Sequence, residues 1–153
     1  MLAVISLAGC ASRDVQKDLR IVDVKSGWYD AGIVEGGKNK LVPSISIHIE
    51  NVSQEPISGV QLNAIFHRQG ETEVWGEHFV RAIGSNEQLN GGGTKTNAIV
   101  LRSNLGYTGT QTRVQMLGNR EFVDATVDIF GKHGSRTWAK MGTFKIDRQL
   151  LSE

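Results

Sequence analysis

Two runs of alternating apolar and polar residues constrain the fold of this chain more than any other feature. In residues 42–50, Ile45, Ile47 and Ile49 alternate with polar side chains. Residues 60–67 repeat the pattern with Val60, Leu62, Ala64 and Phe66. Because successive side chains of a strand point to opposite faces, this alternation predicts two strands, each with one buried and one solvated face.

Weaker patterns of the same kind follow along the chain, and glycine-rich or polar segments separate them. The expected strands are residues 19–24, 42–50, 60–67, 74–83, 98–101, 122–130 and 136–146. Loops are expected at 31–40, 84–97, 103–110 and 131–134, a helical turn at 113–117, a bulge at Gly142, and a frayed or helical tail at 147–153. Short strands without a clear amphipathic helix predict an all-β antiparallel sandwich.

Residues 45–66 also resemble a known kind of domain. An alternating strand, then Glu50-Asn51-Val52-Ser53 with Pro56 and Ile57, then a second alternating strand resembles the central hairpin of immunoglobulin-like and fibronectin-III-like ectodomains of bacterial lipoproteins. In those domains the two strands supply the core. The resemblance implies an immunoglobulin-like sandwich of about seven or eight strands. The Cys…Trp…Cys framework is absent, so this would be a disulfide-free relative.

The one cysteine of the chain, Cys10, directly follows a short apolar run. The residues Leu7-Ala8-Gly9-Cys10 resemble the lipobox of bacterial lipoproteins, in which the cysteine thiol carries a diacylglycerol and the preceding peptide is removed. The run is far shorter than the roughly 20 residues of a membrane-spanning helix. The resemblance implies a membrane anchor through lipid on Cys10.

On this basis we expect a lipoprotein signal peptide at residues 1–9, a lipidated tether at 10–18 and a single sandwich domain at 19–153. No Lys or Arg precedes Cys10, which departs from a typical signal and leaves two alternatives: a signal that starts at Met1, or a truncated one whose true start lies upstream. Ala11 follows the cysteine, where aspartate often marks inner-membrane retention in enteric bacteria, so the resemblance favours the outer membrane, facing the periplasm. The alternative interpretation is a short buried strand with a chance cysteine.

Candidate catalytic, metal and phosphate sites are weak. Asp124 and Asp128 share a strand face but lie roughly 13 Å apart at about 3.3 Å per residue, beyond the spacing of glycosidase carboxylates. Four scattered histidines, His48, His67, His78 and His133, lack a metal-binding motif, although His48 and His67 could approach each other across adjacent strands. Residues 91–96 lack the Gly-Lys-Ser/Thr order of a phosphate-binding loop. We therefore expect no enzyme, no cofactor and no metal.

Protein binding is the remaining class. The net charge of +1 gives no broad case for nucleic acid. Among the large aromatic residues we expect Trp75 and Trp138 in the core and Tyr107, in a glycine-flanked loop, as an exposed protein contact. Edge strands of an open sandwich could also accept a partner's strand.

These observations predict a lipid-anchored protein of the bacterial cell envelope that acts as a binding or structural module for an envelope protein partner. The alternative is a periplasmic small-ligand carrier with an apolar pocket between the sheets.

Overall fold

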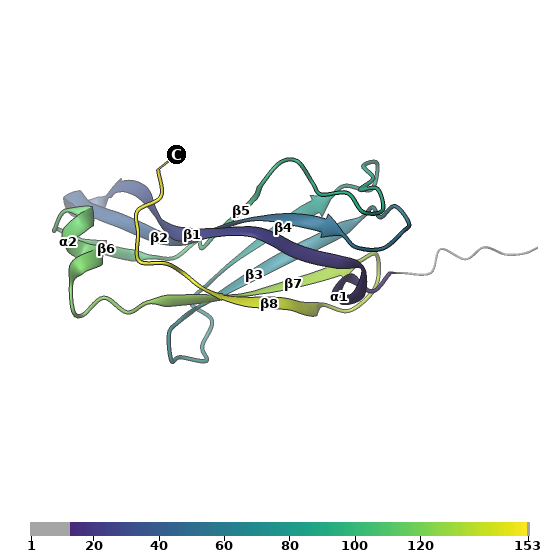
Figure 1. The fold of residues 1–153 in the computed structure, drawn as a ribbon. Coiled ribbons are helices and arrows are strands. Elements are labelled where there is room, and N and C mark those ends of the chain that lie inside the picture. Colours follow the sequence, from purple (N-terminus) through teal and green to yellow (C-terminus); the bar gives the residue numbers. More distant parts are fainter. Residues whose placement is uncertain (1–12, 153) are drawn as a thin grey trace, which may run out of the picture.

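The two alternating segments form the central strands of two different sheets. The computed structural model describes residues 13–152. One antiparallel sheet contains β1 (Leu19–Val34), β2 (Lys38–Asn51), β5 (Ile99–Arg102) and β6 (Tyr107–Gly109), with β5 and β6 on successive parts of one side of β2. The other has the order β4 (Gly76–Ile83), β3 (Val60–Arg68), β7 (Ala125–His133) and β8 (Ala139–Lys145). The sheets pack face to face (Figure 1), which confirms the predicted all-β sandwich.

The expectation of a central hairpin at residues 45–66 is wrong in one respect. β2 and β3 do not pair with each other: residues 52–59 carry the chain from the first sheet to the second. Both strands nevertheless supply the core, as the resemblance implied. Their apolar side chains face the space between the sheets, and Ile45, Ile47, Ile49, Val60, Leu62, Ala64 and Phe66 are fully buried.

The first strand is much longer than residues 19–24, and the loop expected at 31–40 is wrong. β1 continues to Val34, and the short 3-10 turn η1 (Glu35–Gly37) connects it to β2 in a long hairpin. Register shifts interrupt this hairpin between Val22 and Lys25 and between Asp30 and Ile33. Asp23 adopts a positive φ of 51° at the first shift. These bulges explain why the alternation in the sequence is imperfect, because each extra residue exchanges the two faces of the strand.

The segments near the C-terminus also differ from the expectations. Residues 131–133 continue β7, and the turn begins after them. Residues 147–151 are neither frayed nor helical: they run beside β1, where Trp28 N donates to Gln149 O at 2.7 Å and Leu151 N donates to Trp28 O at 3.0 Å. The expected bulge in the last strand is confirmed, since the register of β7 and β8 shifts beside Gly142.

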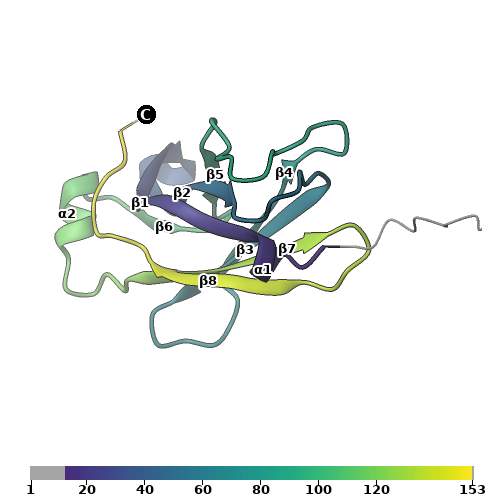
Figure 2. The same ribbon diagram turned by 45° about the vertical axis from the view of Figure 1, so that its right-hand side comes forward.

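Two short helices lie at opposite ends of the sandwich (Figures 1 and 2). α1 (Val15–Asp18) precedes β1, and Val15 packs into the core. α2 (Arg113–Gly118) confirms the expected helical turn and begins with a capping box between Thr112 and Gln115. Within residues 13–152, no helix has the length and hydrophobicity needed to cross a membrane.

A buried asparagine joins the crossover at residues 52–59 to the long loop at 84–97. The Asn51 side chain donates to Glu55 O and Leu89 O, at 2.8 and 3.0 Å, and accepts from the backbone and hydroxyl of Ser53. Its backbone exchanges hydrogen bonds with Gly92 and Gly93. Because a buried amide is costly unless its bonds are made, this set of partners explains how a polar residue ends a core strand.

The loop expected at 103–110 contains β6, which pairs with β2 from Leu41 to Asn39. Gly106 makes this approach possible. A Cβ atom at residue 106 would lie 2.1 Å from the Leu41 carbonyl oxygen. The backbone of any other residue would have to move away from β2.

We therefore expect Gly106→Ala to destabilise the protein by about 1–3 kcal/mol, as overpacking against a fixed backbone does. Gly118→Ala is the matched control, because no atom lies within 4 Å of the added Cβ. Chemical denaturation of both variants measures the free energies of unfolding. Equal stability of the two variants would contradict the close approach.

Candidate functional site

Four aromatic rings gather at the end of the sandwich that carries α2. Trp28 is at the centre: its ring centroid lies 4.6 Å from Phe122, 5.6 Å from Tyr107 and 6.2 Å from Trp75. Tyr107 also contacts Trp75 and Phe122, at 4.8 and 4.9 Å. These separations are typical of favourable aromatic pairs. Four segments that are distant in sequence therefore meet in one rigid cluster.

Backbone pairing and an arginine side chain hold three of the four rings in place. Trp28 is fully buried in β1, with residues 149–151 bonded along its backbone. Tyr107 is positioned by the pairing of β6 with Leu41. Phe122 is held by Arg148, whose guanidinium donates to Phe122 O at 2.7 Å and Asp124 Oδ1 at 2.9 Å, and lies 5.1 Å from the Phe122 ring.

Beside this cluster is an open hollow of about 220 Å³. Tyr107, Met116 and Phe122 supply its apolar wall. The other lining residues are mostly polar: Thr108, Gly109, Gln111, Asn119 and Glu121. A small apolar depression with a polar rim is the usual form of a contact site for one large side chain of a partner protein.

Two exposed apolar side chains lie on elements next to this hollow. Ile33 is 71% exposed and Val114 is 70% exposed. They come from neighbouring elements, since Arg113 forms an ion pair with Asp30 and Asn39 donates to Gln111 O at 2.8 Å. We call this surface, defined by Ile33, Tyr107, Val114, Met116 and Phe122, the distal end, because it lies opposite α1.

Tyr107, the residue predicted to contact a partner, is half-buried at the distal end. Its hydroxyl donates to Val123 O at 3.1 Å. Burial raises the pKa of Tyr107 above its usual value, against an opposing influence from Arg68. The phenol therefore stays neutral at physiological pH and offers its ring for contact. Its role as a protein contact stays a prediction.

Of the two tryptophans predicted to lie in the core, one does and one does not. Trp75 packs against the core, as expected. Trp138 does not: it is 39% exposed, because it precedes β8 and lies on the outer face of the second sheet against Phe79. Trp28, which was not predicted as a core residue, is the fully buried tryptophan. Trp28 lies between the two register shifts of β1, which interrupt the alternation of apolar and polar residues that would have predicted its burial.

The two aspartates considered for catalysis have separate partners. Asp124 binds Arg148, whereas Asp128 accepts from Thr143 and lies 3.3 Å from Lys140 and 3.5 Å from His67. Partial burial acts to raise the pKa of Asp128, but the bonds from Thr143 and Lys140 outweigh it and the pKa lies below its usual value.

The expected approach of two histidines across adjacent strands is wrong, because His48 is in β2 and His67 is in β3, which belong to different sheets. Within the described part of the chain, no three His, Cys, Asp or Glu side chains are placed to hold a metal ion. The glycine-rich loop serves packing, since a Cβ at Gly91 would lie 2.4 Å from Gln54 O.

The opposite end of the sandwich receives the chain from the predicted tether. Cys10 and Ala11 lie outside the described residues, which begin at Arg13. Arg13 N donates to His133 Nδ1 at 2.8 Å, and its guanidinium binds Asp18, Ser53 and Pro56. α1 packs on β7 and β8 at this end. We call it the proximal end because it is nearest to the predicted tether. The chain is therefore held firmly from Arg13 onward.

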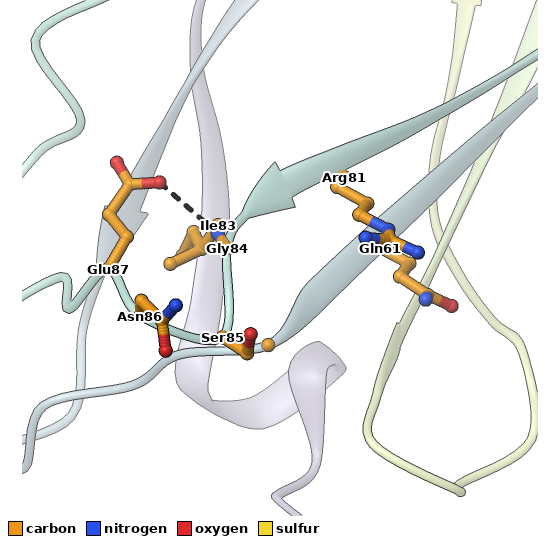
Figure 3. A pocket seen from close by; sticks show the side chains of 8 residues that line it. Gln61, Arg81, Ile83, Gly84, Ser85, Asn86 and Glu87 are labelled. Carbon is orange, nitrogen blue, oxygen red and sulfur yellow. Dashed lines mark hydrogen bonds between the residues drawn. The ribbon is translucent and has the colours of Figure 1, made fainter.

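A second hollow, of about 550 Å³, opens at the proximal end, where β3 begins and β4 ends. Figure 3 shows Gln61 and Arg81 side by side on these strands, and the turn at residues 84–87 lines the same hollow. Glu87 accepts from Gly84 N and forms an ion pair with Lys95, and these contacts hold the pKa of Glu87 below its usual value. Arg81 makes no ion pair with any residue that the structure describes.

No family model and no curated protein matches the chain. Among solved structures, a crystal structure of a protein from Archaeoglobus fulgidus is similar at 16% identity and a TM-score of 0.40, over 82% of this chain and 91% of that one.

The contact between Arg13 and His133 should make the stability of the fold depend on pH. Burial, with the nearby Arg13, lowers the pKa of His133 below its usual value of about 6.5. The unfolded chain therefore takes up this proton at a higher pH than the folded protein, and the contribution to stability is lost as the pH falls through about 6.5. We expect His133→Gln to lose less stability than the wild-type protein between about pH 7.5 and pH 5.5. Urea denaturation across this range measures both, and identical pH profiles would contradict the expectation.

Proposed function

We propose that this protein is a lipid-anchored binding module of the bacterial cell envelope. In this proposal lipid on Cys10 attaches it to a membrane, the outer membrane by preference, and the sandwich faces the periplasm. The distal end binds an envelope protein. The observation that carries the proposal is the placement of an apolar hollow, with exposed Ile33 and Val114 beside it, at the end opposite Arg13.

The geometry supports binding at the distal end for a physical reason. Exposed large apolar side chains lose contact with water when a partner covers them, which stabilises a complex by about 25 cal/mol per Å² of apolar area. The aromatic cluster beneath the hollow is rigid, so a partner would pay little ordering entropy on this side of the interface. A tether at the proximal end leaves the distal end accessible.

The small-ligand carrier has weaker support. The space between the sheets is filled by fully buried side chains such as Ile45, Leu62 and Ile129. The apolar hollow of about 220 Å³ is open at the surface and is smaller than the roughly 300–1,000 Å³ of typical ligand pockets. This alternative stays a prediction, and native mass spectrometry that finds a co-purified ligand would favour it.

The anchor is tested by Cys10→Ser. Since two or more acyl chains give stable membrane attachment and none remains without the thiol, we expect the variant to move from the membrane fraction to the soluble periplasmic fraction. Ser12→Ala, two residues away, is the control and should stay with the membrane. Membrane retention of Cys10→Ser, or loss of both variants from the membrane, would count against the lipid anchor.

The binding surface is tested by a photoreactive amino acid at Val114 in intact envelopes. We expect repeated capture of one envelope protein from this position. Val100, a 41% exposed valine on the outer face of β5, is the matched control position and should capture none of it. Val114→Asp should abolish capture by a probe placed at Ile33. Equal capture from Val100 and Val114, or none from either, would overturn the assignment of the distal end.

A further inference from the structure

We infer that the proximal end carries a lipid-facing surface that seats on anionic phospholipid headgroups. The surface consists of Phe79, Arg81, Lys132 and Trp138, on the outer face of the second sheet. The inference rests on the proposed lipid anchor for its setting, but its residues and geometry are independent of Cys10.

The apolar part of this surface is a pair of exposed rings. Phe79 is 51% exposed and Trp138 is 39% exposed, and their ring centroids lie 6.1 Å apart in an edge-to-face arrangement. Exposed apolar side chains that lie together in one patch often mark a site of contact with a protein or a membrane. Tryptophan is enriched where a protein meets the headgroup region of a bilayer, because its ring is apolar and its N–H is polar.

The charged part lies beside these rings. Gln61 is in register with Arg81 on one side and with Lys132 on the other, so the three side chains form one row across β4, β3 and β7. The Lys132 ammonium lies 5.0 Å from the centre of the Trp138 ring. Neither Arg81 nor Lys132 forms an ion pair within residues 13–152.

The nearest acidic side chains have other partners. Asp14, which lines one hollow together with Lys132, lies 3.9 Å from Arg136. Glu87 is bound to Lys95, and Asp128 to Lys140 and Thr143. Glu77 lies two positions before Phe79 on β4, on the side away from the proximal end. The row therefore complements negatively charged headgroups.

The path of the chain places this surface close to the predicted anchor. Arg13 is bonded to His133, the neighbour of Lys132, and Gly134 N donates to Gly59 O next to the row. The α carbons of Cys10 and Arg13 are at most about 11 Å apart, since an extended chain spans up to about 3.6 Å per residue. A lipid on Cys10 would therefore hold these side chains within reach of the bilayer surface.

The test uses the full chain, with Cys10 coupled chemically to a maleimide lipid in vesicles, so that it does not depend on lipidation in the cell. Brominated lipids quench tryptophan at the bilayer surface, and Trp138→Phe identifies the signal of Trp138. We expect quenching in vesicles with 30% phosphatidylglycerol and much less in pure phosphatidylcholine. Each basic side chain near an anionic surface changes the equilibrium about fivefold, so Arg81→Gln with Lys132→Gln should lower the ratio of docked to undocked protein about 25-fold.

The matched control is Lys38→Gln with Arg120→Gln, which removes the same charge from two exposed positions outside the surface and should dock as the wild-type protein does. Equal quenching in neutral and anionic vesicles, or none that Trp138→Phe removes, would overturn the inference. So would an undiminished signal in the Arg81 and Lys132 variant. Failure here together with membrane release of Cys10→Ser in cells would leave the anchor intact. Docking to the vesicles, together with membrane retention of Cys10→Ser in cells, would reject the lipid anchor but support the lipid-facing surface.

Discussion

Burial of one apolar layer between β2 and β3 is the interaction on which the remaining structure depends. Each strand lies in the interior of its own sheet and presents its isoleucine, leucine or phenylalanine side chains to the other sheet. Full burial of such a side chain contributes about 1.5–3 kcal/mol, and the chain contains no second cysteine from which to build a disulfide. The neighbouring strands pair with β2 or β3, so the faces that β2 and β3 bury determine which residues of the neighbouring strands point into the core.

Hydrogen bonds other than strand pairing cover parts of the sheet edges. Along part of β1 the backbone groups of Trp28 bond to residues 149–151. On the opposite side, Arg102 N donates to His78 Nδ1 at 2.9 Å and Glu77 N donates to Asn104 Oδ1 at 3.1 Å, which joins β5 to β4 across the two sheets. Exposed edges invite pairing with other chains. These contacts make strand addition at the bonded positions unfavourable and favour the ends of the sandwich as contact surfaces.

The two ends differ in chemistry. The distal end combines a packed aromatic cluster with exposed aliphatic side chains, and an ion pair joins Arg113 to Asp30 at its rim. The proximal end combines the exposed rings of Phe79 and Trp138 with Arg81 and Lys132, neither of which forms an ion pair within residues 13–152. An apolar surface suits a protein partner, whereas an aromatic and basic surface suits the headgroup region of a bilayer. This division agrees with a module attached at one end and binding at the other.

The sequence by itself determined the class of fold and the central strands, because period-two alternation in residues 42–50 and 60–67 reflects burial of one face regardless of what covers it. It also predicted α2, whose capping box is a local interaction. Only the tertiary structure decided that β2 and β3 lie in different sheets, that Tyr107 lies in a strand against Leu41, and that Trp28 rather than Trp138 is the core tryptophan. These features depend on bulges, a glycine contact and the path of residues 147–151, which join residues far apart in the chain. No local pattern records them, and the aromatic cluster and the row of Gln61, Arg81 and Lys132 exist only once those distant segments meet.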